Sequence, residues 1–215
     1  MLGLLGKKLG QTRVYDATGK VVSVTVVLAG PNRVVQCKTV ASDGYQAVQL
    51  GFEEQKPQRV PKPLLGHFKK HGGPPMKRLR EFRDFPLEVK QGDLLGATVF
   101  AAGDYVDAIG VTKGKGFEGV VKRHGFRGGD MTHGAKGWHR RSGAIGQRLF
   151  PGTVMRGTRM PGHMGQVRRT VQNLQVVAVK EADNLLLIQG AIPGAAGDYV
   201  VIREAKKRRK SAAQA

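Results

Sequence analysis

Four of the six histidines lie in the middle of the chain, and they are the first candidates for chemistry. A histidine works as a general base or a nucleophile when a neighbouring group orients its ring. Asp130 is the one acid near His124, His133, His139 and His163, which otherwise lie among Arg and Gly. Such histidines suit hydrogen bonds to RNA or stacking on its bases. An RNA-cleaving or RNA-modifying enzyme that uses His133, His139 or His163 stays open as the alternative.

Three further patterns could hold a cofactor or a metal, and each lacks a necessary part. Gly114–Gly119 matches G-x-G-x-x-G, but it has no βαβ context and no acid about 20 residues later. His67 and His71 are four residues apart, yet no cysteine cluster or nearby carboxylate completes a zinc site. Cys37 is the single cysteine, so it cannot form an internal disulfide, and nothing beside it favours a lowered thiol pKa. We therefore expect no cofactor, no metal, no catalytic residue and no small-molecule substrate.

Positive charge is concentrated in residues 111–170. This segment holds 13 Lys and Arg against two acids, and 14 of the 31 glycines, in a chain of net charge +20. It is too basic and too poor in Leu, Ile and Val to order itself by burying apolar surface. We expect a polyanion to order it, because each Lys or Arg that neutralises a phosphate releases a condensed counterion. A disordered basic linker is the alternative, but Trp138, Phe117, Phe126 and Phe150 favour contact with a surface.

Several groups in this segment would contact RNA. The Gly114–Gly119 turn could bring backbone amides and lysines to phosphates, with a plain structural turn as the alternative. Trp138–Arg141 combines an indole, an imidazole and arginine planes that can stack on unpaired bases, unless Trp138 is the local core. Later glycines allow close approach to a backbone that arginines then bind. The predicted RNA-binding residues are Lys113, Lys115, Lys122, Arg123, Arg127, His133, Lys136, Trp138, His139, Arg140, Arg141, Arg156, Arg159, His163 and Arg168.

The type of nucleic acid follows from what the segment lacks. A protein that reads duplex DNA usually presents a recognition helix to the major groove, and the segment contains no pattern for one. Repeated Gly and Arg instead favour folded RNA. A DNA-compacting protein stays open, and it would bind duplex DNA as tightly as RNA.

Strand patterns dominate outside the basic segment. Short β-rich runs separated by Gly/Pro turns predict a mainly β fold, either a small antiparallel barrel or a sandwich, interrupted by a long, basic, irregular extension. A short helix is expected near Leu64–Lys70, within a proline-rich excursion. The predicted strands are Val21–Leu28, Arg33–Val40, Tyr45–Gly51, Leu79–Phe85, Leu94–Phe100, Tyr105–Val111, Val171–Val179, Leu185–Gln189 and Tyr199–Arg203.

The expected organisation has three parts. Residues 1–111 and 168–205 would form the globular β domain, with the excursion at about 53–90, and residues 112–167 would form the extension. Residues 206–215, which begin with five basic side chains, would be a disordered tail whose contact with RNA is left open. No apolar run reaches about 18 residues, so neither a membrane-spanning helix nor a membrane partner is expected. The single cysteine fits a reducing, cytoplasmic setting.

At this point the sequence resembles the large-subunit ribosomal protein L-three family, in its bacterial form. The matching motifs are long, follow one another in order and span nearly the whole chain, from Gly3 to about Arg203. They are Gly3–Thr12 (GLLGKKLGQT), Lys113–Phe117 (KGKGF), Lys122–Arg123, Thr132–Gly134, His139–Arg140, Gly143–Gln147 (GAIGQ), Met160–Gly165 (MPGHMG), Thr170–Leu174 (TVQNL) and Asn184–Gly194 (NLLLIQGAIPG).

The resemblance implies a structural rRNA-binding protein of the large ribosomal subunit in the cytoplasm, rather than an enzyme. Its globular part would be a barrel like those of translation factors. Its extension would bind large-subunit (23S) rRNA and reach toward the peptidyl transferase centre, and the protein would join early in subunit assembly beside other large-subunit proteins. The extension tip would comprise Ile145, Gly146, Gln147, Arg148, Leu149, Phe150, Pro151 and Gly152.

Three places depart from the family pattern. Many bacterial relatives have Met where this chain has Gln11. Some carry a methyl-accepting glutamine where this chain has Leu149, so tip methylation is not expected here. The basic run Lys206–Lys210 is not a general feature of the family.

Overall fold

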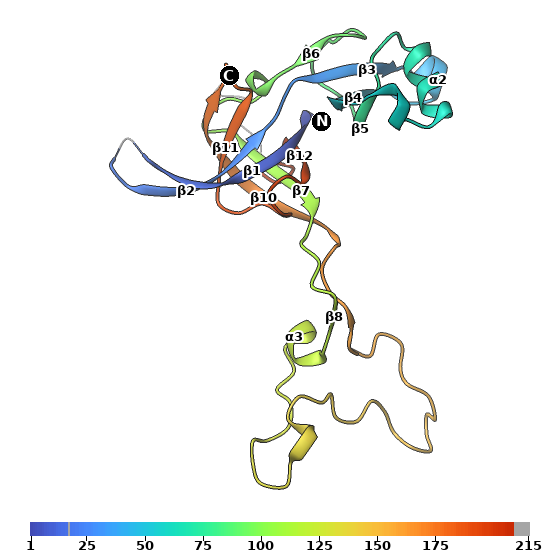
Figure 1. The fold of residues 1–215 in the computed structure, drawn as a ribbon, viewed down its shortest axis with the longest axis vertical. Coiled ribbons are helices and arrows are strands. Elements are labelled where there is room, and N and C mark those ends of the chain that lie inside the picture. The colour runs from blue at the N-terminus through green and yellow to red at the C-terminus, as the bar shows by residue number, and fades with distance from the viewer. Residues whose placement is uncertain (17, 209–215) are drawn as a thin grey trace. The chain divides into compact units, whose positions relative to one another are not determined.

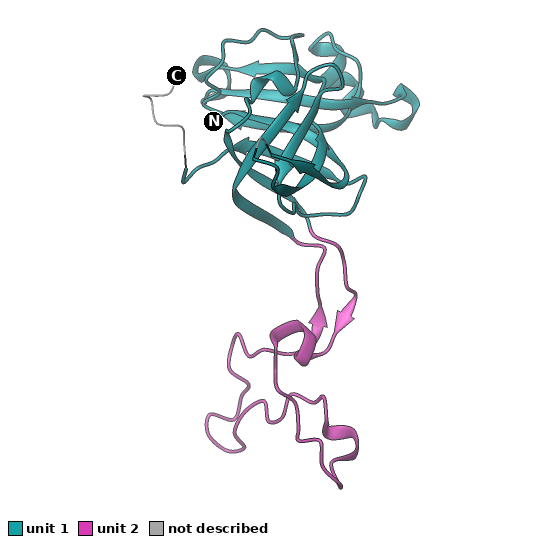
Figure 2. Cartoon of the chain, turned by 90° about the vertical axis from the view of Figure 1, so that its left-hand side faces the viewer, with its two compact units in different colours: residues 1–111, 168–215 teal, residues 112–167 magenta. Residues whose placement is uncertain are grey.

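The computed structural model describes residues 1–16 and 18–208, and the chain divides into two compact units. Unit 1 comprises Met1–Val111 and Arg168–Ala215, and unit 2 comprises Thr112–Val167 (Figures 1 and 2). Most of the expected disordered tail, residues 209–215, lies outside the described residues. Of the described tail residues, Arg208 places its guanidinium carbon 3.9 Å from the ring centroid of Tyr105.

Six antiparallel strands of unit 1 close into a barrel, which confirms the mainly β fold class (Figure 1). β2, β7 and β11 have the predicted bounds, because each is a mainly apolar run. In barrel order the strands are β1 (Gly3–Tyr15), β12 (Tyr199–Glu204), β7 (Tyr105–Val111), β10 (Arg168–Lys180), β11 (Leu185–Gln189) and β2 (Val21–Leu28).

Strand β1 was not predicted, because its sequence places glycines and lysines among the leucines. Gly6 lies so close to β2 that a Cβ there would come within 2.8 Å of the Leu28 carbonyl oxygen. Lys8 is 8% exposed, and its ammonium donates to the carbonyl oxygens of Ile192 and Gly194, each at 2.9 Å. These carbonyls satisfy a charge that would otherwise make burial unfavourable. A lysine in the barrel wall is therefore compatible with a strand.

The barrel interior is filled by aliphatic side chains, and β7 and β11 are buried over several consecutive residues. Burying a large aliphatic side chain stabilises the folded state by about 1.5–3 kcal/mol, and this is the main favourable contribution to such a fold. Fully buried residues of the barrel strands include Leu4, Val24, Val27, Val106, Val176, Leu186, Ile188, Val200 and Ile202.

A second sheet follows β2 in the chain and has the order β5-β4-β3-β6. Its strands are β3 (Asn32–Lys38), β4 (Ala47–Glu54), β5 (Met76–Arg83) and β6 (Leu94–Leu95), and a one-turn helix, α1 (Val40–Asp43), lies between β3 and β4.

The expected helix forms as α2 (Lys62–Lys70), and its start is favoured by proline in the first turn. The short 3-10 helix η1 (Pro57–Arg59) precedes it. Phe68 of α2 packs with Val35, Val60 and Met76 in a small cluster of buried side chains.

The predicted strand Leu94–Phe100 is wrong beyond Leu95. The chain turns at Gly96 and forms the 3-10 helix η2 (Ala97–Val99). The side chain of Asn184 lies against this turn, and its Oδ1 accepts a hydrogen bond from the Ala97 N–H at 3.3 Å. A Cβ at Gly96 would come within 2.5 Å of the same oxygen.

A buried asparagine joins the second sheet to the barrel. Asn32 is fully buried, and its Nδ2 donates to the carbonyl oxygens of Leu5 and Ala29, both at 3.0 Å. Its Oδ1 accepts from the Leu5 N–H at 3.1 Å. Leaving one such buried group unpaired would cost roughly 1–3 kcal/mol, so this contact fixes the start of β3 against β1.

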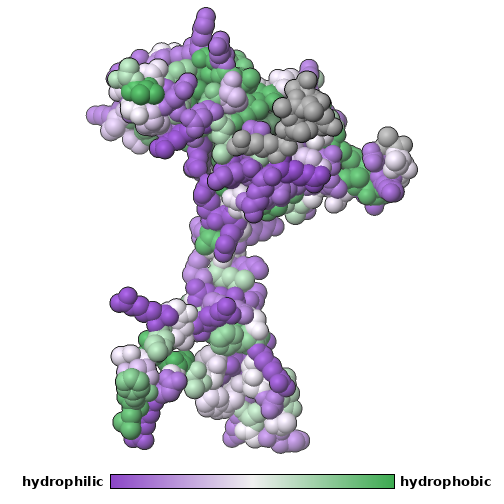
Figure 3. Space-filling view, turned by 180° about the vertical axis from the view of Figure 1, so that it is seen from behind, coloured by the Kyte–Doolittle hydropathy of each residue, from purple (hydrophilic) through white to green (hydrophobic). Residues whose placement is uncertain are grey.

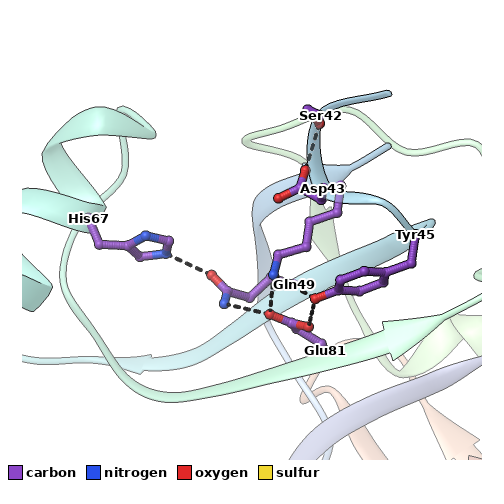
Figure 4. Close-up of polar contacts among 7 residues, drawn as sticks. Ser42, Asp43, Tyr45, Gln49, His67 and Glu81 are labelled. Carbon is purple, nitrogen blue, oxygen red and sulfur yellow. Dashed lines mark hydrogen bonds and ion pairs between the residues drawn. The ribbon is translucent and has the colours of Figure 1, made fainter. Parts of the chain in front are cut away.

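A polar network joins β3, β4 and β5 of the second sheet to α2 (Figure 4). Glu81 forms an ion pair with Lys38 at 2.8 Å and accepts a hydrogen bond from the Tyr45 hydroxyl at 2.8 Å. Bonding to Lys38 is the main cause that lowers the pKa of the Glu81 carboxyl. Gln49 links this carboxylate to α2, because its Oε1 lies 2.8 Å from Nε2 of His67. Burial, followed by the charge of His71, lowers the pKa of the His67 imidazole.

Candidate nucleic-acid interface

Unit 2 begins and ends in a neck of two antiparallel segments of the chain, residues 112–118 and 162–167 (Figure 2). Backbone hydrogen bonds join the two segments of the neck, among them Lys115 N–H to Met164 O at 2.9 Å and Gln166 N–H to Thr112 O at 3.1 Å. The neck ends in the paired strands β8 (Phe117–Glu118) and β9 (Gly162–His163). Gly165, at φ +79°, lies so close to the Lys113 carbonyl oxygen that a Cβ would overlap it. The neck is therefore defined by backbone contacts and leaves its side chains available.

Helix α3 (Val120–His124) follows β8 and is held against the returning chain. Arg123 Nη1 donates to the Met160 carbonyl oxygen at 2.6 Å, and His124 Nε2 lies 3.0 Å from the same oxygen. A helix of five residues after the Gly114–Gly119 turn differs from the long helix of a dinucleotide-binding unit. Arg123 thus has a structural contact as well as a charge.

Unit 2 has few acids to neutralise its cations. Of its eleven Lys and Arg, only Lys122 and Arg127 pair with a carboxylate, through Glu118 and Asp130 respectively. The Arg127 pair is 3.8 Å long and both side chains are highly exposed, so it contributes little. The nine cations without a carboxylate partner in this fully described unit are Lys113, Lys115, Arg123, Lys136, Arg140, Arg141, Arg148, Arg156 and Arg159.

The predicted RNA-binding residues are exposed except Arg123 and His139, which are half-buried. The structure brings together Trp138 and Arg141, whose guanidinium carbon lies 4.7 Å from the indole centroid. Lys113, Lys115 and His163 lie along the neck, and Lys122 and Arg123 lie on α3. The other predicted residues of unit 2 are distributed over the segment between α3 and β9, which includes η3. Arg168 belongs to unit 1, where it lies on β10 opposite Val111.

Trp138 ends the 3-10 helix η3 (Lys136–Trp138) and is 57% exposed, so it is not a buried core residue of this unit. Five cavity-lining residues around it were missing from the predicted set: Phe126, Gly128, Gly129, Ser142 and Gly143. The pair Gly128–Gly129 after an aromatic residue was the available signal, because adjacent glycines often allow two backbones to approach closely.

The predicted tip residues form an open loop without regular secondary structure. Leu149 and Phe150 are 90% and 89% exposed, which is unusual for large apolar side chains. Figure 3 shows the hydrophilic and hydrophobic surface of both units from one side. All tip residues are exposed apart from Pro151, which is half-buried.

The other candidate sites of the sequence are also located by the structure. The His67 and His71 rings lie 4.8 Å apart, and within residues 1–16 and 18–208 no three His, Cys, Asp or Glu residues gather as metal ligands would. Cys37 is half-buried, and burial raises the pKa of its thiol. No helix in the described part of the chain is long and apolar enough to cross a membrane.

Comparison with known proteins identifies the family. The family model for Ribosomal protein L3 matches residues 62–185. The large ribosomal subunit protein uL3 of Deinococcus radiodurans is 51% identical over 207 residues, which cover 96% of each chain. The protein of the same name from Akkermansia muciniphila is 50% identical over 212 residues, 96% of this chain and 99% of the relative. This chain therefore belongs to the ribosomal protein L3 family, whose members are structural ribosomal proteins and not enzymes.

Proposed function

We propose that this chain is a structural component of the large ribosomal subunit and binds 23S rRNA through unit 2. One observation carries the proposal: nine exposed or half-exposed cations of this unit have no carboxylate partner. Uncompensated cations this close together repel one another, and a phosphate backbone would relieve that repulsion and release counterions. The names of the two relatives agree with this assembly.

The shape of unit 2 supports rRNA over a regular DNA duplex. Its regular elements are the neck strands, the five-residue α3 and the one-turn η3, so it offers no long helix to a major groove. Loops with exposed arginines and glycines can follow the irregular surface of folded RNA, where unpaired bases and phosphates are accessible. Neighbouring large-subunit proteins would contact the barrel unit.

We also propose the finer role that the family resemblance implies. The loop Ile145–Gly152 would reach toward the peptidyl transferase centre, and the chain would enter the subunit early in assembly. The exposure of Leu149 and Phe150 supports this, because apolar side chains held in water are stabilised when a partner covers them.

The test is the salt dependence of binding to purified 23S rRNA. The variant Arg140→Gln/Arg156→Gln/Arg159→Gln removes three unpaired cations of unit 2. If each contacts a phosphate, the slope of log Kobs against log salt should become shallower by about 2. Binding isotherms measured from about 50 to 200 mM salt provide the slope.

The matched control removes three exposed lysines of unit 1, as Lys56→Gln/Lys62→Gln/Lys69→Gln. Its slope should stay close to that of the unaltered chain, although both variants lose the same net charge. Equal losses in the two variants would show that total charge, and not unit 2, determines binding. Equal affinity of the unaltered chain for a DNA duplex of the same length would favour the DNA-compacting alternative.

A further inference from the structure

A cavity of about 410 Å³ lies in unit 2 between two segments of the chain. One wall comes from Phe126–Gly129, directly after α3, and the other comes from Trp138 and Arg141–Gly143. Its volume is within the range of sites that bind small organic groups, about 300–1,000 Å³. None of the lining residues carries a carboxylate.

The cavity is built by specific backbone contacts. The Gly129 N–H donates to the His139 carbonyl oxygen at 3.1 Å, which joins the two walls. A Cβ at Gly128 would overlap this same oxygen, and one at Gly129 would come within 2.8 Å of the Trp138 carbonyl oxygen. Gly128 also has φ +83°, a conformation that other residues rarely adopt. The sequence thus specifies the close approach of the two walls.

The side chains of the walls offer flat faces and positive charge. Trp138 is 57% exposed, and the Arg141 guanidinium lies 4.7 Å from its ring centroid. Phe126 contributes a second aromatic ring from the opposite wall, and Arg127 a second cation. Aromatic rings and guanidinium planes are the groups on which proteins stack unpaired bases, while the cations attract the adjoining phosphates.

We infer that this cavity holds one unpaired base of the RNA, an inference that rests on the function proposed above. The charge of unit 2 selects a polyanionic partner over an apolar peptide segment. Stacking recognises the face of a base. Apart from backbone groups and the Ser142 hydroxyl, the hydrogen-bonding side chains of the lining are the donors Arg127, Arg141 and Trp138, and every base edge carries acceptors for such donors. The pocket therefore accepts any of the four bases, with purines favoured by their larger stacking area.

Trp138 is the only tryptophan of the chain, so its fluorescence reports on this cavity alone. The probes are three RNAs: octaadenylate, an abasic octamer with the same phosphates, and an octaadenylate–octauridylate duplex. Octaadenylate should quench the tryptophan emission of the full chain as it binds. The abasic octamer and the duplex should bind through their phosphates without quenching, because neither offers a free base.

Affinity measurements on labelled RNA complete the test. Trp138→Leu should weaken octaadenylate binding about tenfold, the effect of one lost base stack, and should not change binding of the abasic octamer. Trp138→Tyr should restore most of that loss. Phe117→Leu is the matched control, since Phe117 is 77% exposed in the same unit but does not line the cavity, and it should bind octaadenylate as the unaltered chain does.

The possible failures are distinguishable. Unchanged octaadenylate affinity in Trp138→Leu, with salt-dependent binding intact, would overturn the base pocket and leave the proposed function standing. Failure of the unaltered chain to bind any RNA would overturn both. Quenching by adenosine monophosphate but not by octaadenylate would replace the RNA base with a free nucleotide and so overturn the inference.

Discussion

The same cationic residue types have different partners in the two units. In unit 1, Lys7 and Lys77 pair with Glu53, and Arg203 pairs at 3.2 Å with Asp107, which is fully buried. These pairs fix strands and loops to one another. In unit 2, all of which is described, nine of the eleven Lys and Arg have no carboxylate partner, and under the proposed function phosphates would neutralise them. Unit 2 differs in its scarcity of acids, since it holds two against eleven Lys and Arg, which the total charge of the chain cannot reveal.

The contact between His67 and Gln49 makes a pH-dependent contribution to the stability of the second sheet. Burial lowers the pKa of His67 in the folded state, so the unfolded state binds the proton more readily. The contribution is complete above the unfolded pKa of about 6.5 and is lost as the pH falls below it. Urea unfolding at several values between pH 7.5 and 5 should show His67→Gln losing less stability on acidification than the unaltered chain.

His133→Gln is the control for this measurement, because His133 is an exposed histidine of unit 2. It should follow the unaltered chain at every pH. Glu81, whose pKa is lowered mainly by Lys38, contributes stability that is lost only at lower pH, below its usual value of about 4.5. An acid sensitivity of His67→Gln equal to that of the unaltered chain above pH 5 would contradict the assignment.

At the scale of elements, strand bounds are predicted best where the local sequence of the strand is sufficient to define them. β2, β7 and β11 are apolar runs that end at clear turns, and their bounds follow from local pattern. β1 is different, because the burial of Lys8 depends on carbonyls more than 180 residues away. β6 ends early at a turn where the distant Asn184 accepts a hydrogen bond from the Ala97 N–H. Such long-range contacts carry no local signal, so the sequence could not reveal them.

The candidate site shows the same division. The composition alone shows that positive charge and glycine are concentrated in residues 111–170, and it predicts that this segment binds a polyanion. The cavity beside Trp138 could not be predicted from the sequence, because it depends on the approach of Gly128 and Gly129 to the Trp138 and His139 carbonyls. Two adjacent glycines suggest a close approach but do not say which segment is approached.

Removal of the tip loop should impair the proposed function of the chain and leave the folding of the barrel unchanged. Replacing Ser142–Met155 with a short Gly-Ser linker removes exposed residues together with the half-buried Ser142 and Pro151, and leaves the neck and α3 in place. Thermal unfolding of the barrel should be almost unchanged, because no buried residue of unit 1 is altered. Subunit assembly or peptide transfer should be impaired, which sucrose gradients and a puromycin assay would detect. Ribosomes that contain this variant and work normally would refute the role proposed for the tip.

At the scale of the whole molecule, the barrel is closed by segments from both sides of unit 2. β7 precedes unit 2, and it pairs with β10 and β12, which follow it. β1 and β2, which also precede unit 2, pair with β12 and β11, so a cut within residues 112–167 leaves two fragments that remain joined by four strand ladders. Each ladder combines backbone hydrogen bonds with buried side chains, so the fragments should stay associated without denaturant.

Limited digestion with trypsin tests this organisation in the full chain. Apart from cuts in the terminal run Lys206–Lys210, the first cuts should fall in the loops between α3 and β9, where exposed Arg residues are most frequent and backbone hydrogen bonds are few. The two fragments should elute together in gel filtration and separate only in denaturant. Adding 23S rRNA should slow these cuts more than it slows any cut in unit 1. First cuts in the barrel strands, or equal protection of both units by rRNA, would contradict a barrel that stays folded while unit 2 binds RNA.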